Sequence, residues 1–234
     1  MDSMRADRRI ELIGGILIYG KQDQSIDYAT LHDALEGPDG FQLGAGEALS
    51  ADGLGKIAER LSGRQNSGFL HERMLSWGTN SMAWWLPAGH RAVFFNTKDS
   101  ELRDRSGCVP CPTLIFACAK GRWFVGALKG SQRPKAHDRV FHSPFLNVYE
   151  GGAICTGTAK VPKSASSDSI EEWESAFFSS RFTHSNFRME KQIDYPQGIM
   201  QFWVDMLDGK FSEFPEDLLM PMDMTVSDFV SGEI

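Results

Sequence analysis

The 234-residue sequence has few cysteines, no long apolar run and no cluster of basic residues. Its longest apolar runs, Gly14–Tyr19 and Thr113–Ala119, are far shorter than the ~20 residues that a membrane-spanning helix needs. Its 23 glycines and 10 prolines fall well below the excess typical of collagen-like or disordered chains. The sequence therefore predicts a soluble globular protein of one large or two small domains, with no membrane partner.

The net charge of −7 is unevenly distributed along the chain. Residues 205–234 hold eight acidic side chains and one basic one, Lys210, so this segment accounts for the whole net charge. Phosphate recognition depends on localised positive charge, and no such footprint is present. We expect no nucleic-acid partner, and we interpret the acidic end as a solvated tail rather than a docking element for a basic partner.

The N-terminal residues do not predict a secretory signal, because Glu11 interrupts the apolar run Ile10–Tyr19 and no small-residue cleavage site follows. We therefore expect a reducing, cytoplasmic location. In that compartment the four cysteines are free thiols, metal ligands or nucleophiles rather than a disulfide framework.

Cys108 and Cys111 form a Cys-x-x-Cys pair. A zinc site of this kind has a second pair some 15–20 residues later. Cys118 instead follows after seven residues, inside an apolar run that reads as a strand. We expect no bound metal and no other cofactor, and we interpret these thiols as structural, with a labile Cys108–Cys111 disulfide as the alternative.

Two elements are predicted in residues 1–75, which we treat as an N-terminal extension or subdomain. The β-branched run Ile10–Tyr19 predicts a strand. Residues 51–61 follow Ser50, carry apolar side chains at helical spacing and precede Gly63, which predicts a helix.

Residues 76–234 are predicted to form the main domain, of class α+β. Short apolar runs bounded by turn residues predict an antiparallel β-meander; they are Ala83–Leu86, Ala92–Phe95, Leu114–Ala119 and Trp123–Leu128. Two helices follow in the sequence. One begins with a capping box, Ser169-x-x-Glu172, and the other spans a stripe from Ile199 to Leu207 and stops at Gly209.

The segment 133–169 has little periodicity and much turn chemistry. We expect it to pack against the meander as a flap, because it carries apolar anchors worth roughly 1.5–3 kcal/mol each when buried. The anchors are Phe141, Phe145, Leu146, Val148 and Ile154. In this arrangement Tyr149 shields the surroundings of Cys155.

Asn147 and Cys155 lie eight residues apart in this flap, with a Glu-Gly-Gly turn between them. A nucleophilic thiol needs exposure, a field that favours the thiolate and a donor for the oxyanion. A turn after Tyr149 brings Asn147 near Cys155. From spacing alone, however, a small buried cysteine is the more frequent case.

The segment Asn147-Val-Tyr-Glu-Gly-Gly-Ala-Ile-Cys155 is similar to the His-Pro-Asn-x-Tyr-x-x-Gly-x-x-Cys signature of ubiquitin-conjugating enzymes. Phe145 and Leu146 stand where that signature has histidine and proline. A wider pattern resembles PRTRC system protein B, a bacterial branch of the ubiquitin-conjugating fold. Its segments are Trp84-Trp85-x-Pro87-Ala-Gly, Arg91-x-Val-Phe-Phe95, Ala127-Leu-Lys129, Arg133-Pro134, Pro144-Phe-x-Asn147-Val, Trp173-Glu-x-x-Phe-Phe178 and Phe182-Thr-His-x-Asn186.

The resemblance implies a ubiquitin-conjugating-like fold and a thioester carrier. Cys155 would accept a ubiquitin-like protein from a ThiF-type activating enzyme and pass it to an unidentified amine acceptor. Asn147 would be an oxyanion donor or a brace for the flap, and its presence in a turn is the alternative explanation. His184 would deprotonate the thiol or the amine, or else brace a helix end.

Two other functions remain open. One is a catalytically inactive binding module with the same fold, which the replaced motif histidine favours. The other is a cysteine hydrolase that uses Cys155 and His184, for which no orienting Asn or Asp motif is recognisable.

Overall fold

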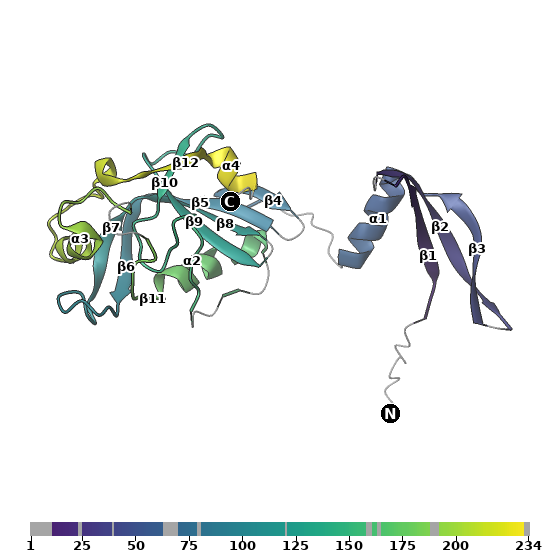
Figure 1. Ribbon diagram of the computed structural model, residues 1–234, viewed down its shortest axis with the longest axis horizontal. Coiled ribbons are helices and arrows are strands. Elements are labelled where there is room, and N and C mark those ends of the chain that lie inside the picture. Colours follow the sequence, from purple (N-terminus) through teal and green to yellow (C-terminus); the bar gives the residue numbers. More distant parts are fainter. Residues whose placement is uncertain are drawn as a thin grey trace, which may run out of the picture. The chain divides into compact units, whose positions relative to one another are not determined.

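The computed structural model describes residues 11–22, 25–38, 40–62, 70–78, 81–119, 121–157, 161–162, 165–187 and 192–231. The chain divides into two compact units at residues 68–69 (Figure 1). Its sheets are mostly antiparallel and its helices few, which confirms the α+β class. The N-terminal boundary predicted at residue 75 stays a prediction.

The first unit is a three-stranded antiparallel sheet followed by a helix. Its elements are β1 (Gly14–Gly20), β2 (Ile26–Gly37), β3 (Gly40–Ala48) and α1 (Ala51–Ser62). The predicted strand is confirmed from Gly14 to Tyr19, and the predicted helix is confirmed. Ile10 and Gly63 lie outside the described residues. Strands β2 and β3 were not predicted, because their apolar and polar residues do not alternate cleanly along the sequence and most of their side chains are exposed.

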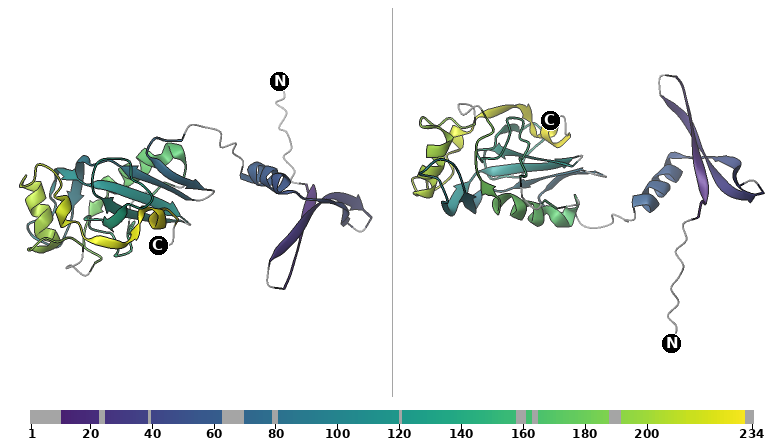
Figure 2. Two further views of the ribbon diagram at one scale, coloured as in Figure 1. Left: turned by 90° about the horizontal axis from the view of Figure 1, so that it is seen from above. Right: turned by 60° about the horizontal axis from the view of Figure 1, so that its bottom comes forward.

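The main sheet of the second unit has six strands in the order β12-β10-β9-β8-β5-β4. These are β4 (Met74–Gly78), β5 (Ser81–Leu86), β8 (Thr113–Ala119), β9 (Arg122–Leu128), β10 (Arg139–His142) and β12 (Pro221–Thr225). Each face of β8 enters a different apolar cluster: Phe116 packs with α2 (Ile170–Phe178), whereas Ile115 packs with α4 (Val226–Ser231). The two helices therefore cover opposite faces of this sheet (Figure 2).

A second sheet has the order β11-β6-β7, formed by β6 (Gly89–Phe95), β7 (Ser106–Cys111) and β11 (Arg181–Phe182). The prediction of a single meander is therefore wrong. Strands β5 and β6 pair with β8 and β7 in one continuous register, from Ser81↔Ala119 to Phe94↔Ser106. Pro87 and Pro112 interrupt this long hairpin at the same level, and because proline has no N–H to donate to the ladder, the hairpin bends there into the second sheet.

Helix α2 packs its apolar face on the main sheet. Trp173 contacts the rings of Trp84 and Trp123, and Phe177 contacts those of Phe116 and Phe145. The predicted Ser169–Glu172 capping box is wrong, because the box lies one turn earlier, between Ser166 and Ser169 at the 3-10 turn η1 (Ser167–Ser169).

The second predicted helix is confirmed as α3 (Gly198–Leu207), which buries Ile199, Phe202, Trp203 and Met206. Gly209 follows with φ +75°, as expected for a helix stop. Among the described residues no helix is both long enough and apolar enough to cross a membrane.

The acidic C-terminal segment is folded from Asp205 to Ser231, so the prediction of a solvated tail is wrong there. After the 3-10 turn η3 (Glu216–Leu218), strand β12 pairs with β10, and α4 buries Val226 and Phe229. Several acidic groups have specific partners: Asp208 pairs with Arg105, and Glu216 accepts a hydrogen bond from the Gly130 N–H.

Candidate functional site

The chain from Pro144 to Cys155 makes a tight reversal stabilised by its own backbone. Val148 and Ile154 form a β-bridge, and the Tyr149 N–H donates to the Ala153 carbonyl at 2.8 Å. At the open end of the reversal, the Cys155 N–H donates to the Asn147 carbonyl at 2.8 Å. The predicted turn therefore brings Asn147 and Cys155 together.

Gly152 is required at the tip of this reversal. Its φ is +81°, in the left-handed region that L side chains rarely adopt. A Cβ at this position would also lie 3.0 Å from the Val125 carbonyl oxygen of β9. The Glu-Gly-Gly signal in the sequence is thus explained by a turn that passes close to a strand.

The predicted flap is anchored in the core. Phe145, Leu146 and Val148 are completely buried, and Phe141 and Ile154 pack against the same cluster. Phe145, which stands at the place of the motif histidine, contacts the rings of Phe177, Phe182 and Trp203. The anchors thus hold the segment that carries Asn147 and Cys155 against the apolar core of the second unit.

The Asn147 side chain is hydrogen-bonded to the segment that follows α2. Its Nδ2 donates to the Arg181 carbonyl at 2.8 Å, and its Oδ1 accepts from the N–H and hydroxyl of Thr183 at 3.0 and 2.7 Å. Asn147 has φ +61°, a conformation that a non-glycine residue adopts at a cost. The Asn147 side chain therefore links its own segment to residues 181–183. Its predicted roles, oxyanion donor or brace for the flap, stay predictions.

His184 is brought to the same place from 37 residues further along the chain. Its carbonyl accepts the Asn147 N–H at 2.8 Å, and its Nδ1 lies 2.7 Å from the Thr183 hydroxyl. The imidazole is exposed, and the neighbouring Asn186 forms a parallel bridge with Tyr149. The segment carrying His184 therefore runs beside the one that carries Tyr149.

Cys155 is partly exposed, and Tyr149 contacts its sulfur. The hydrogen bond between the Tyr149 hydroxyl and the Cys155 side chain, with the negative charge of the thiolate, raises the pKa of Tyr149. Tyr149 is 47% exposed, so its contact with Cys155 lies at the surface. The phenol hydroxyl of Tyr149 thus lies within hydrogen-bonding reach of the Cys155 side chain.

Two buried side chains that sequence reasoning missed fix the residues before Asn147. Gln192 is completely buried, and its Nε2 donates to the carbonyls of Ser143 and Phe145 at 3.2 and 2.7 Å. The Trp203 Nε1 donates to the intervening Pro144 carbonyl at 3.0 Å. Nothing near Asn147 in the sequence points to them, because they lie more than 40 residues away.

Gln192 also accepts a hydrogen bond from the Ser185 hydroxyl at 2.8 Å. It therefore ties the segment before Asn147 to the segment that carries His184. We call Gln192 and Trp203 the carbonyl clamp.

The other cysteines have different surroundings. Cys111 and Cys118 are buried in β-strands, and burial raises the pKa of Cys111 to about 12 and that of Cys118 well above its usual range. Cys108 is exposed on β7. All four thiols are free, so the alternative Cys108–Cys111 disulfide is not formed, and no group of three or more potential metal ligands is found within the described residues.

The family model described as Prokaryotic E2 family D matches residues 53–222, which is well over half of the chain and includes the whole segment from Asn147 to His184. No curated protein and no solved structure matches the chain.

Proposed function

The chain belongs to prokaryotic E2 family D, and from this membership we propose that it is a thioester carrier for a ubiquitin-like protein. The family implies a ubiquitin-conjugating-like fold, in agreement with the α+β structure, and suggests a role in ubiquitin-like conjugation. Cys155 is the carrier thiol in our proposal. A ThiF-type activating enzyme supplies the ubiquitin-like protein, and an amine accepts it. The finer resemblance to PRTRC system protein B and the cytosolic location belong to the same proposal.

One observation supports this assignment most strongly: Cys155 is partly exposed in a tight reversal that a backbone hydrogen bond closes onto Asn147. Cys111 and Cys118 are buried, where desolvation disfavours the thiolate. Cys108 is exposed, but it lies within β7, opposite Ala92, without a comparable turn. Cys155 is thus the thiol whose surroundings suit acyl transfer.

The proposed reaction has two exchanges. In the first, the Cys155 thiolate attacks the thioester carbonyl on the activating enzyme, and the enzyme's thiolate leaves. In the second, an amine attacks the carbonyl on Cys155, forms a tetrahedral oxyanion and loses a proton, and the intermediate expels the Cys155 thiolate. The departing thiolate is stabilised by the Tyr149 hydroxyl, whose contact with the sulfur is present in the free protein.

Asn147 has two compatible roles in this scheme. One hydrogen of its Nδ2 is donated to the Arg181 carbonyl, and the second remains for an oxyanion. Meanwhile its Oδ1 holds Thr183 and thereby the segment that carries His184. His184 is exposed on that segment, and we assign it the proton released by the attacking amine.

The experiment supplies the purified protein with its cognate ubiquitin-like protein, the activating enzyme and ATP, and follows adducts on non-reducing gels. We expect a reductant-sensitive adduct that persists in the Cys108→Ser, Cys111→Ser and Cys118→Ser variants. Cys155→Ser should instead give an oxygen ester that survives thiol reductant. A reductant-sensitive adduct in Cys155→Ser would contradict the assignment.

The second candidate is a binding module that presents the ubiquitin-like protein without chemistry. Its supporting observation is that Phe145, a buried aromatic residue, occupies the place of the motif histidine. This candidate predicts no adduct in any variant while the unmodified ubiquitin-like protein still binds the chain.

A further inference from the structure

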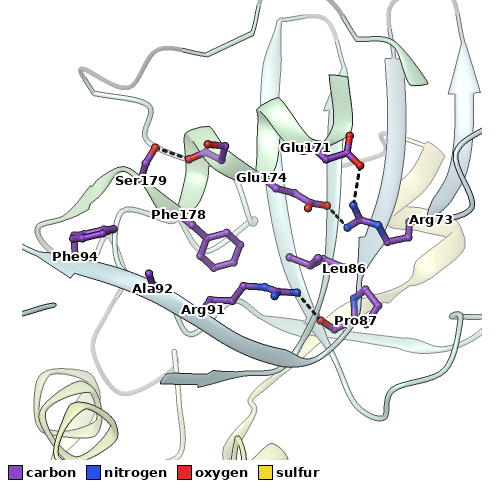
Figure 3. Close-up of a pocket in the computed structure, with 11 residues that line it drawn as sticks. Arg73, Leu86, Pro87, Arg91, Ala92, Phe94, Glu171, Glu174, Phe178 and Ser179 are labelled. Atoms are coloured by element: carbon purple, nitrogen blue, oxygen red, sulfur yellow. Dashed lines mark hydrogen bonds and ion pairs between the residues drawn. The ribbon is translucent and has the colours of Figure 1, made fainter. Parts of the chain in front are cut away.

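An open cavity of about 640 Å³ lies between helix α2 and strand β6, within the second unit (Figure 3). Its apolar wall is formed by Leu86, Pro87, Phe94 and Phe178. Two arginines, Arg73 and Arg91, line it from the strand side. None of the residues assigned to the thioester site lines this cavity, and its volume is within the range of ligand sites.

The first arginine already has acidic partners. The Arg73 guanidinium lies 2.5 Å from Glu174 and 3.5 Å from Glu171, both on α2. Glu174 also accepts the Trp84 Nε1 at 3.0 Å, and Glu171 also accepts from His71 at 3.0 Å. The carboxylates of Glu171 and Glu174 therefore balance the positive charge of Arg73.

The second arginine has no such balance. Within the described ranges, the hydrogen bonds of the Arg91 side chain are to the backbone carbonyls of His90 and Pro87, each at 3.4 Å, which is long for a hydrogen bond. Among the described residues, no carboxylate lies within ion-pair distance of it. The nearby Cys111 thiol is neutral, because burial raises its pKa to about 12. A partly buried guanidinium with such partners is incompletely satisfied, and an anion could supply the missing acceptors.

The arrangement of charge and apolar surface defines the ligand. In Figure 3 the Arg91 side chain runs along the cavity floor toward Pro87, with Phe178 and Leu86 beside it. The anion therefore has to sit within a few ångströms of an apolar group. A planar carboxylate suits the fork of an arginine, which can bind both oxygens at once.

We propose that this cavity binds the C-terminal residue of a partner polypeptide, with its carboxylate on Arg91 and its apolar side chain on Phe178 and Leu86. A C-terminal residue carries its carboxylate and its side chain on one Cα, so both reach the same cavity. In an extended peptide, an acidic side chain and its apolar neighbour point to opposite sides and cannot both enter. A partner polypeptide whose C-terminal residue is Leu, Ile or Phe therefore matches both the charge and the apolar wall of the cavity.

The test uses the full chain, labelled with ¹⁵N, and three short probes. The first is acetyl-Gly-Gly-Leu with a free carboxylate, the second is the same peptide amidated, and the third is acetyl-Gly-Asp-Leu amide. We expect the first probe to shift amide resonances of β6 and α2. Both amidated probes should bind at least about tenfold more weakly, since each lacks the terminal carboxylate.

Arg91→Gln should weaken binding of the first probe by about tenfold or more, and Ala92→Glu, which adds a carboxylate at an exposed position of the cavity wall, should do the same. The matched control is Arg103→Gln. Arg103 also donates to two backbone carbonyls, those of Thr97 and Lys98, but it does not line the cavity. Its loss should leave probe binding unchanged.

The proposal is overturned if the amidated first probe binds as well as the free acid, or if no resonance of β6 or α2 shifts at millimolar probe. Equal binding of the acidic amidated probe would assign the cavity to acidic side chains instead and would also overturn it. None of these outcomes depends on adduct formation at Cys155, so failure here and failure of the carrier assignment are distinguishable.

Discussion

At the residue scale, Asn147 combines a strained backbone with a side chain that is hydrogen-bonded to both Arg181 and Thr183. Asn147→Ala removes the bonds to Arg181 and Thr183 and keeps a Cβ at φ +61°, so we expect a loss of about 2–3 kcal/mol in the free energy of unfolding. Asn147→Gly loses the same bonds but not the strain, and should be about 1 kcal/mol more stable than the alanine variant. Urea denaturation measures both.

The same variants separate bracing from chemistry. If the Asn147 amide acts on the oxyanion, Asn147→Ala still loads Cys155 but discharges to an amine more slowly. If Asn147 only braces residues 181–184, loading and discharge fall together. A single-turnover discharge assay on preloaded protein distinguishes the two outcomes.

The second prediction at the residue scale concerns Gln192. Gln192→Leu leaves the Ser143 and Phe145 carbonyls buried without a donor, so we expect a loss of about 2–4 kcal/mol in the free energy of unfolding. The control is Gln201→Leu, which removes a partly buried amide that donates to Asp205 at 2.8 Å and should cost less than about 1 kcal/mol. Equal losses for the two variants in urea titrations would contradict the view that the buried hydrogen bonds of Gln192 stabilise the fold.

We expect Asp205 to make a contribution to the free energy of unfolding that is lost at acidic pH. Hydrogen bonds from Lys210, Tyr195 and Gln201 lower the pKa of Asp205 from 3.8 to about 2. A carboxyl with a lowered pKa stabilises the folded state fully above its unfolded pKa and loses that contribution as the pH falls toward the folded value. The stability difference between the natural protein and Asp205→Asn should therefore shrink between about pH 4 and pH 2, as measured by thermal unfolding. A stability difference that does not change with pH in this range would contradict a stabilising role for the ionised Asp205 carboxylate.

At the element scale, a partly buried ion pair joins Glu174 of helix α2 to Arg73, which precedes strand β4. The side chains of Arg73 and Glu174 are 15% and 13% exposed, and burial raises the pKa of Glu174 although Arg73 and Trp84 act against this. Arg73→Met leaves a buried carboxylate without its cation, so we expect a loss of about 2–4 kcal/mol. The double variant Arg73→Met/Glu174→Leu should recover part of that loss.

The control for this prediction is Arg105→Met, which breaks an ion pair with Asp208 at 2.6 Å on the surface. Exposed pairs contribute little, so its cost should stay below about 1 kcal/mol. If Arg73→Met and Arg105→Met lost the same free energy of unfolding in urea titrations, the greater burial of the Arg73–Glu174 pair would make no difference to its contribution.

The bent hairpin shows how elements position the candidate sites. Because Pro87 and Pro112 end the β5–β8 ladder, β6 leaves the main sheet and lies beside β11. Strand β11 leads directly into the segment with Thr183 and His184, and its Arg181 carbonyl accepts the Asn147 amide. The second sheet therefore positions one side of the candidate site around Cys155 and also forms one wall of the cavity under α2.

At the scale of the whole molecule, the apolar core belongs to the second unit. Of the buried apolar residues described, only Ala29 lies before residue 69. We therefore expect residues 69–234 to fold alone, with a cooperative thermal transition within a few degrees of the full chain. A broad transition or loss of near-ultraviolet dichroism in this fragment would show that residues 1–68 are needed for its core.

Much of the local structure could be predicted from the sequence by itself. The strands β5, β8 and β9, the helices α1 and α3, and the reversal from Asn147 to Cys155 follow from apolar spacing and from turn residues such as Gly152 and Gly209. These signals act over a few residues, because side-chain periodicity and glycine conformations are properties of the local backbone.

Only the tertiary structure decided which distant groups complete each site. The partners of the Asn147 amide lie 34 to 37 residues away, and Gln192 reaches carbonyls 47 and 49 residues away. The fold also decides that Arg91 has no carboxylate within ion-pair distance in the part of the chain that the structure describes. The acidic end likewise forms β12 because β10 offers it an edge. Such pairings depend on burial and on the directions in which elements cross, which residue spacing does not encode.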